Sequence, residues 1–109
     1  MDFRNLFSDR REVGKTIKAT KVYYLWEFFQ SNKPHKIELF HSVMSGKKKL
    51  CLDAQVITED SSYKYNFQYS FRIENHYFNV VQTASDNFDL RIDNAPFKQI
   101  SEQIRHDGG

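Results

Sequence analysis

The chain has 109 residues, of which 39% are hydrophobic and 16% aromatic, and its formal net charge is +2. This length suits one domain, and four Gly and two Pro are too few for long disordered linkers. No run approaches the roughly 18 apolar residues of a membrane helix, and the N-terminus lacks a signal-peptide core, so we expect no membrane span. A single cysteine, Cys51, cannot form an internal disulfide, so we expect a cytoplasmic protein.

Charge is distributed unevenly along the chain. Residues 1–50 hold eleven Lys/Arg and five Asp/Glu, whereas residues 51–109 hold five and nine. Such a split has two interpretations. It can attract an acidic partner, or it can place lysines on a sheet edge, where they discourage aggregation.

Alternation of apolar and polar residues predicts the fold. Residues 1–14 show no sustained period and are predicted to be a lead-in segment, followed by a sandwich domain over residues 15–96. Because strand side chains point alternately to opposite faces, the alternation predicts antiparallel strands. We place them at 16–30, 35–42, 48–53, 56–58, 65–73, 76–82 and 87–93, with polar turns between them, including a loop over 59–62. The fold class is therefore all-β, an antiparallel β-sandwich of seven to eight strands with a short C-terminal helix.

The apolar positions of these strands give the predicted core. They share one face of each strand, as Phe67, Tyr69 and Phe71 do in the clearest case. The full set is Val22, Tyr24, Trp26, Phe28, Ile37, Leu39, Leu50, Leu52, Phe67, Tyr69, Phe71, Phe78, Val80, Phe88, Leu90 and Ile92.

After the strands the chemistry changes at Asn94. We interpret Asn94 as a helix cap and Pro96 as part of the first helical turn. Residues 97–109 are predicted to be an amphipathic helix, or the start of a coiled coil. Phe97, Ile100 and Ile104 form its apolar stripe.

No pattern of catalytic or ligand-binding chemistry stands out. Gly14-Lys15-Thr16 resembles the end of a phosphate-binding loop, but Asp9 occupies the place of the required Gly and a strand follows instead of a helix. The four histidines lack a paired metal-ligand spacing. Cys51 lies between two leucines and is better interpreted as a packing residue than as a nucleophile. We therefore expect no enzyme activity and no catalytic, cofactor-binding or metal-binding residues.

Three groups of residues make up the predicted interaction surface. Tyr23, Leu25 and Phe29 lie opposite the core face of the first strand, and Lys47, Lys48 and Lys49 are predicted to form an exposed hairpin tip. The third group is the helix stripe Phe97, Ile100 and Ile104. We expect a protein partner, unidentified from the sequence, and a homodimer joined by the strand face with the helix as an extension. The alternative is an anionic ligand, a nucleic acid or acidic lipid headgroup bound through the basic N-terminal half. Nucleic acid is the less favoured of these, because no Gly-rich aromatic signature is present.

A resemblance supports this function class. From His35 the chain reads His-Lys-Ile-Glu, then Ser45-Gly46-Lys47, then Leu50-Cys51-Leu52-Asp53. This resembles the β domain of the Fas apoptosis inhibitory molecule family, over about residues 20–97. The resemblance implies a non-enzymatic all-β sandwich that binds proteins or acts as a scaffold. It also implies a domain of a larger protist-type protein, and it leaves association with the cytoskeleton open.

The chain departs from the family pattern at one turn. Ala54-Gln55 stands where the family has Gly after Asp53, so we expect that turn to be built differently.

Overall fold

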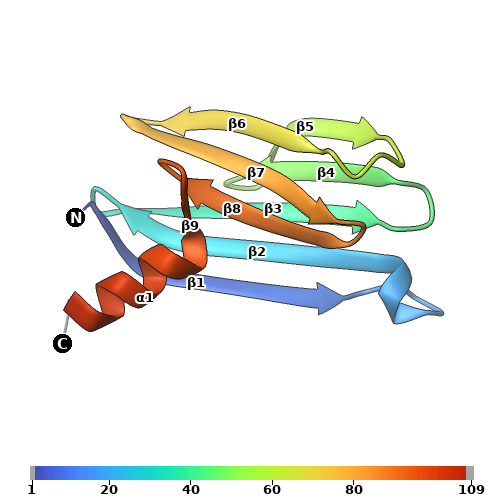
Figure 1. Cartoon of the computed structure of the whole chain (residues 1–109), viewed down its shortest axis with the longest axis horizontal. Coiled ribbons are helices and arrows are strands. Elements are labelled where there is room, and N and C mark those ends of the chain that lie inside the picture. Colours follow the sequence, from blue (N-terminus) through green and yellow to red (C-terminus); the bar gives the residue numbers. More distant parts are fainter. Residues whose placement is uncertain (1, 108–109) are drawn as a thin grey trace. The chain divides into compact units, whose positions relative to one another are not determined.

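The computed structural model describes residues 2–107 and is shown in Figure 1. Within these residues the chain forms two compact units, divided between Lys64 and Tyr65. The first unit carries a five-stranded antiparallel sheet, and the second a four-stranded antiparallel sheet followed by a short helix. The predicted fold class, antiparallel β-sheets with a short C-terminal helix, is confirmed, with nine strands among the described residues instead of seven or eight.

Every strand of the first sheet pairs with the next one in the sequence. The order is β1 (Phe3–Glu12), β2 (Lys21–Gln30), β3 (Lys33–Ser42), β4 (Lys47–Leu52) and β5 (Gln55–Ser61). A single 3-10 turn, η1 (Lys18–Thr20), lies between β1 and β2. Strand β5 continues to Ser61, so the polar loop expected over residues 59–62 is mostly strand.

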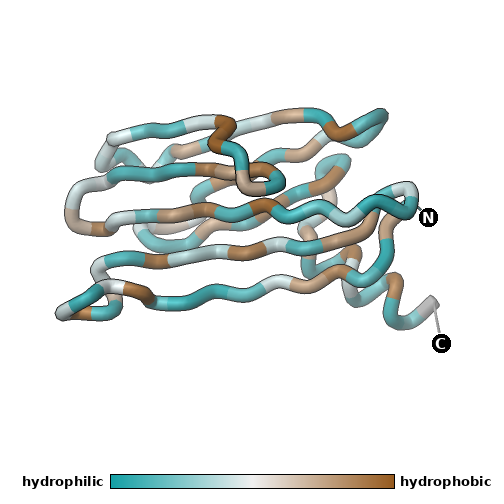
Figure 2. The backbone as a smooth tube through the Cα atoms, turned by 180° about the vertical axis from the view of Figure 1, so that it is seen from behind, coloured by the Kyte–Doolittle hydropathy of each residue, from teal (hydrophilic) through white to brown (hydrophobic). Residues whose placement is uncertain are grey.

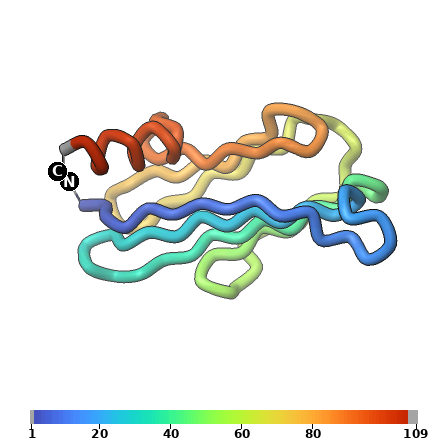
Figure 3. The backbone as a smooth tube through the Cα atoms, turned by 90° about the horizontal axis from the view of Figure 1, so that it is seen from below, coloured from blue at the N-terminus to red at the C-terminus, as the bar shows by residue number. Residues whose placement is uncertain are grey.

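Strand β1 corrects the prediction of a lead-in segment. It pairs with β2 from Phe3 opposite Gln30 to Glu12 opposite Val22, and Figure 3 shows it in dark blue alongside β2. The register shifts between Arg4 and Phe7, which breaks the apolar alternation that sequence patterns depend on. As an edge strand, β1 also tolerates the charged residues that made its sequence unlike a strand. Phe3 is nevertheless buried, with its ring edge-on to Phe28 at 5.9 Å.

The second sheet has the order β6 (Gln68–Ile73), β7 (His76–Ala84), β8 (Asn87–Ile92) and β9 (Ala95–Pro96). Helix α1 (Phe97–Asp107) follows directly and contacts β8 and β9. The prediction of Asn94 as a helix cap is wrong, because Asn94 has a φ of 69° in the turn between β8 and β9. Pro96 likewise belongs to β9 and precedes the helix.

The apolar positions of alternate strand residues are the buried ones, and Figure 2 shows brown and teal segments alternating along the strands. Twelve of the sixteen predicted core residues are buried. The other four, Leu52, Phe67, Tyr69 and Phe71, are only half-buried. Leu52 ends β4, and Phe67, Tyr69 and Phe71 lie in or just before the edge strand β6, where a neighbour is missing on one side.

Three tight turns share a left-handed backbone at two consecutive residues. The φ angles are 50° and 65° at Ser31-Asn32, 50° and 69° at Asp53-Ala54, and 51° and 69° at Asp93-Asn94. Two positive φ values are the mark of the type I′ hairpin turn, whose twist matches that of the strands. Ala54 therefore takes a conformation that glycine would adopt freely, and its turn has the same backbone as those at Ser31-Asn32 and Asp93-Asn94.

An aspartate holds the same kind of turn in each unit. The Oδ1 of Asp53 accepts from the Lys36 N–H at 2.8 Å, while its Oδ2 lies 2.8 Å from His35 Nδ1. In the second unit Asp93 accepts from the Tyr77 N–H at 2.9 Å and lies 2.6 Å from His76 Nδ1. We call each arrangement an Asp–His clamp. It ties the first residue of a turn to the start of an earlier strand.

Candidate functional site

The candidate site is the open face of the first sheet, meaning the face of β1–β5 opposite the buried Val22, Tyr24, Trp26 and Phe28. Residues directly paired across strands share a face, so the register defines its members. Tyr23 pairs with Phe40, and Phe40 pairs with Lys49. The Tyr23 and Phe40 rings are 5.1 Å apart, and the Lys49 ammonium lies 4.8 Å from the centre of the Phe40 ring. This aromatic row crosses the middle strands of the sheet.

Tyr23 is fixed in place by a carboxylate of the same face. Its hydroxyl donates to Glu38 Oε2 at 2.6 Å. Burial, the hydrogen bond to Glu38 and the Glu38 charge raise the pKa of the Tyr23 phenol well above its ordinary value. Tyr23 therefore stays a neutral hydrogen-bond donor, and its ring forms a rigid part of the surface.

Apolar side chains lie near this row on the open face, among charged ones such as Arg11 and Asp9. Leu25 and Phe29 are half-buried on β2, and the Arg4 guanidinium stacks over the Phe29 ring at 4.5 Å. Phe7 and Val56 are each 52% exposed on the two edge strands. Cys51 belongs to the same face but is buried, and its burial raises the pKa of the thiol. The predicted residues Tyr23, Leu25 and Phe29 thus lie on one surface. Residues from neighbouring strands complete this surface, and the apolar alternation within β2 alone could not predict them.

A pocket of about 290 Å³ is hollowed into one end of this face. Three lysines line it: Lys21 from β2, and Lys47 and Lys49 from β4. The apolar side chains of Phe40 and Val13 and the carboxylate of Glu59 also line it. Within the described residues, none of the three ammonium groups lies within ion-pair distance of a carboxylate. The pocket therefore combines an excess of positive charge with an aromatic wall.

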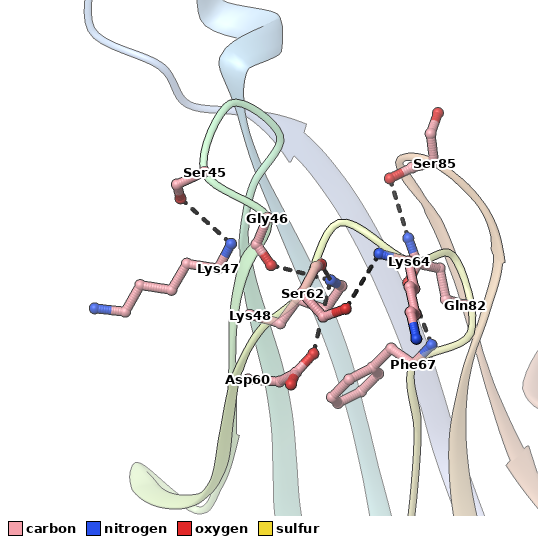
Figure 4. Close-up of polar contacts among 10 residues, drawn as sticks. All are labelled: Ser45, Gly46, Lys47, Lys48, Asp60, Ser62, Lys64, Phe67, Gln82 and Ser85. Carbon is pink, nitrogen blue, oxygen red and sulfur yellow. Dashed lines mark hydrogen bonds and ion pairs between the residues drawn. The ribbon is translucent and has the colours of Figure 1, made fainter.

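The three consecutive lysines do not form the predicted exposed tip. Lys47 and Lys48 leave β4 on opposite sides, as Figure 4 shows, and Lys48 is only 1% exposed. The Lys48 ammonium donates to the carbonyls of Gly46 at 3.0 Å and Ser62 at 2.6 Å, with Asp60 at 3.9 Å. Burial lowers the pKa of this ammonium, and the Asp60 charge offsets part of that shift. The prediction was wrong for Lys48 because consecutive strand residues face opposite sides and carbonyl oxygens compensate the buried charge.

The helix stripe is occupied within the chain itself. Phe97 and Ile100 are buried and Ile104 is half-buried, and α1 contacts β8 and β9. Two of the three residues that were predicted to extend a dimer contact are thus already covered.

The second sheet exposes a polar surface on the strand face opposite its buried residues. Ser70 Oγ donates to Asn79 Oδ1 at 3.1 Å, and the Tyr77 hydroxyl donates to Ser70 Oγ at 2.7 Å. The Arg72 guanidinium lies 6.0 Å from the centre of the Tyr77 ring. These side chains satisfy one another.

Sequence analysis missed three residues of the site: Val13, Phe40 and Glu59. Each is polar or isolated within its own segment, and only the strand register brings them together. The available signal was cross-strand pairing: the hairpins at Ser31-Asn32 and Gly46 place Phe40 between Tyr23 and Lys49.

Comparison with known families shows which family the chain belongs to. The model of the family Fas apoptotic inhibitory molecule (FAIM1) matches residues 22–107. The chain belongs to this family. The resemblance predicted from the run that begins at His35 is therefore confirmed. The matched range of the FAIM1 family begins in β2 and ends with α1, and β1 lies outside it. No curated protein and no solved structure matches the chain.

Residues 2–107 contain no helix that is long and apolar enough to cross a membrane. They also contain no group of three His, Cys, Asp or Glu side chains placed to hold a metal ion.

Proposed function

We propose that this FAIM1 family member is a non-enzymatic protein-interaction domain that binds its partner through the open face of its first sheet. The supporting observation is the contrast between the two sheets. One carries aromatic and aliphatic side chains on its open face, and the other carries Ser70, Tyr77 and Asn79, which hydrogen-bond to one another and of which Asn79 is buried. Exposed apolar patches rimmed by charge are typical of protein-binding sites.

Most of the exposed large apolar side chains also lie in the first unit. They are Phe7, Val13, Ile17, Phe40, Met44, Val56 and Tyr63, against Tyr65 in the second unit. Phe7, Phe40 and Val56 among them lie on the open face, and exposed apolar side chains that share one face support a binding role. The single buried cysteine suits a reducing compartment, so we place this function in the cytoplasm.

The test is quantitative affinity capture with the whole chain and three variants. Leu25→Glu and Phe40→Glu each add one negative charge to the open face, and Gln68→Glu, at an exposed position of β6, is the matched control. Proteins captured by the wild type should be lost from the first two variants and kept by the third. Circular dichroism must show that all three variants are folded. A set of captured proteins that is the same for all four chains would refute the proposal.

A second copy of the chain is the simplest partner for such a face, because symmetric dimers are the commonest oligomers. Light scattering at micromolar concentration tests this homodimer. We expect twice the chain mass for the wild type and the chain mass for Leu25→Glu. A wild-type mass equal to one chain would leave a different protein as the partner.

A further inference from the structure

We propose that the lysine-lined pocket of the first sheet is a recognition site for an acidic segment of a protein partner, one that carries Asp or Glu at alternate positions beside an apolar side chain. This inference rests on the proposed function, because it identifies the chemistry that the open face would recognise.

The lysines of the pocket come from two strands of the first sheet. Lys47 and Lys49 are two residues apart on β4 and stand on the same face, about 6.6–6.8 Å apart along the strand. Lys21 stands on β2, on the far side of β3, roughly 10 Å away across the sheet. Glu59 is the single carboxylate among the residues that line the pocket, so three positive groups face one negative group. The pocket therefore attracts an anion.

The spacing of Lys47 and Lys49 matches that of alternate side chains in an extended peptide. Side chains at positions i and i+2 of an extended chain point to the same side at the spacing that separates Lys47 from Lys49. Two carboxylates at such positions would each meet one ammonium. Lys21 lies on the opposite side of β3 and would bind a third acidic group or the chain end.

Apolar side chains form one wall of the pocket. Phe40 is 38% exposed and Val13 is 48% exposed, and both line the pocket. The Lys49 ammonium already lies over the Phe40 ring, which fixes the direction of its charge. A ligand that adds an apolar side chain next to its carboxylates would cover these surfaces and exclude water from the charge contacts.

Carboxylates fit this pocket better than phosphates do. Its two β4 ammonium groups are separated along the strand by about 6.6–6.8 Å, which suits two separate carboxylates better than one compact phosphate. Glu59 at the pocket would repel the closely spaced phosphates of a nucleic acid more than a short peptide whose carboxylates are set apart. The first unit as a whole also favours acidic partners, with twelve Lys/Arg against eight Asp/Glu in residues 1–64.

The experiment is fluorescence anisotropy with a labelled synthetic peptide of alternating Glu and Ser residues and one Phe. The whole chain should bind it, and binding should weaken as salt is raised. The double variant Lys47→Ser, Lys49→Ser should bind about tenfold more weakly, as expected for the loss of two surface charge contacts. The control is Lys15→Ser, Lys64→Ser, which removes the same charge at exposed positions outside the pocket and should bind like the wild type.

Each of three results would refute the inference. Equal binding of the peptide with Gln in place of Glu would show that carboxylates are not recognised. Tighter binding of a single-stranded oligonucleotide, lost in the same double variant, would assign the pocket to nucleic acid. Complete displacement of the peptide by inorganic phosphate at matched concentration would assign it to phosphate.

The outcome is separable from that of the proposed function. If Leu25→Glu loses a captured partner that the Lys47→Ser, Lys49→Ser variant keeps, the open face binds proteins and the acidic-segment inference is refuted. If no captured protein depends on Leu25 or Phe40, the proposed function is refuted, and the inference that rests on it is refuted as well, even when the peptide binds at the lysines.

Discussion

The two sheets of this chain share a method of construction and differ in the surface that each offers to solvent. Both bury one strand face, and both tie a type I′ turn to an earlier strand with an Asp–His clamp. The first sheet carries an aromatic row and a lysine-lined pocket on its open face, whereas the second carries Ser70, Asn79 and Tyr77 in mutual hydrogen bonds. Charge follows the same division, because residues 65–109 hold four Lys/Arg against six Asp/Glu. Shared construction therefore accounts for stability, and the difference between the surfaces is where function is to be sought.

The largest effect should come from the buried faces. Phe78 is fully buried in the second sheet and stacks on Phe71 at 5.4 Å. Phe78→Ala should lower the free energy of unfolding by about 3–5 kcal/mol, because it removes a large buried ring and leaves a cavity. Phe40→Ala on the open face of the first sheet should cost far less. Urea denaturation measures both. Similar losses would mean that Phe40 is part of the core and that the comparison between faces is wrong.

Lys48 breaks the pattern of exposed lysines in the first sheet, so it offers the next test. Lys48→Ala leaves the Gly46 and Ser62 carbonyls without their ammonium donor, and should cost about 1–3 kcal/mol. Lys47→Ala, at an exposed neighbour, should change stability by less than about 0.5 kcal/mol.

The same lysine should give a pH dependence. Because burial lowers the Lys48 pKa, the folded state loses this proton before the unfolded state does. Wild-type stability should therefore gain an increment as pH rises from the lowered pKa toward the ordinary value of 10.5. The Lys48→Ala variant should lack that increment. An identical pH profile for the two proteins would show that Lys48 is hydrated in solution.

The clamps allow the shared construction itself to be tested. Asp53→Ala and Asp93→Ala each remove an acceptor from one turn, and each should cost about 1–2 kcal/mol. Asp89→Ala removes the same charge from an exposed position of β8 and is the control. Unequal losses from Asp53 and Asp93 would show that the two clamps are alike in geometry only.

Asp93 should make the stability of the folded state depend on pH in the acidic range. The Tyr77 N–H and then His76 hold the pKa of Asp93 below its ordinary value of 3.8. Its contribution is thus present above pH 3.8 and is lost as pH falls through the lowered pKa. The difference in stability between the wild type and Asp93→Ala should shrink over that acidic range.

Sequence patterns predicted the strands well where apolar residues alternated, as from β2 to β8, because a half-buried strand requires that alternation. They failed at β1, where a register shift and edge charges hide the pattern, and at β9, which is two residues long. Within the site, Tyr23 and Leu25 could be predicted because they are apolar residues on the face of β2 that the alternation assigns to solvent. Phe40 could not, because its role depends on which residues face it from β2 and β4. Lys48 could not, because nothing in three consecutive lysines tells which one points inward.

The repeated clamp was also missed, although the sequence contains it. His35 precedes Asp53 and His76 precedes Asp93 at nearly equal separations, and each aspartate begins a turn. The signal is weak because strand length, and not a conserved spacing of side chains, sets that separation.

The smallest effect should come from exchanging one residue between the two matching turns. Ala54 and Asn94 both have a φ of 69°, a backbone shape that Asn tolerates more readily than Ala. Ala54→Asn should raise the free energy of unfolding by up to about 1 kcal/mol, and Asn94→Ala should lower it by a similar amount. The double exchange should then be close to neutral, because the two turns belong to different units and their aspartates accept from different N–H groups, those of Lys36 and Tyr77. Thermal denaturation of the three variants measures the effect. A loss of stability in Ala54→Asn would mean that the Asp53-Ala54 turn has a different backbone in solution, and the equivalence of the two clamps would fail with it.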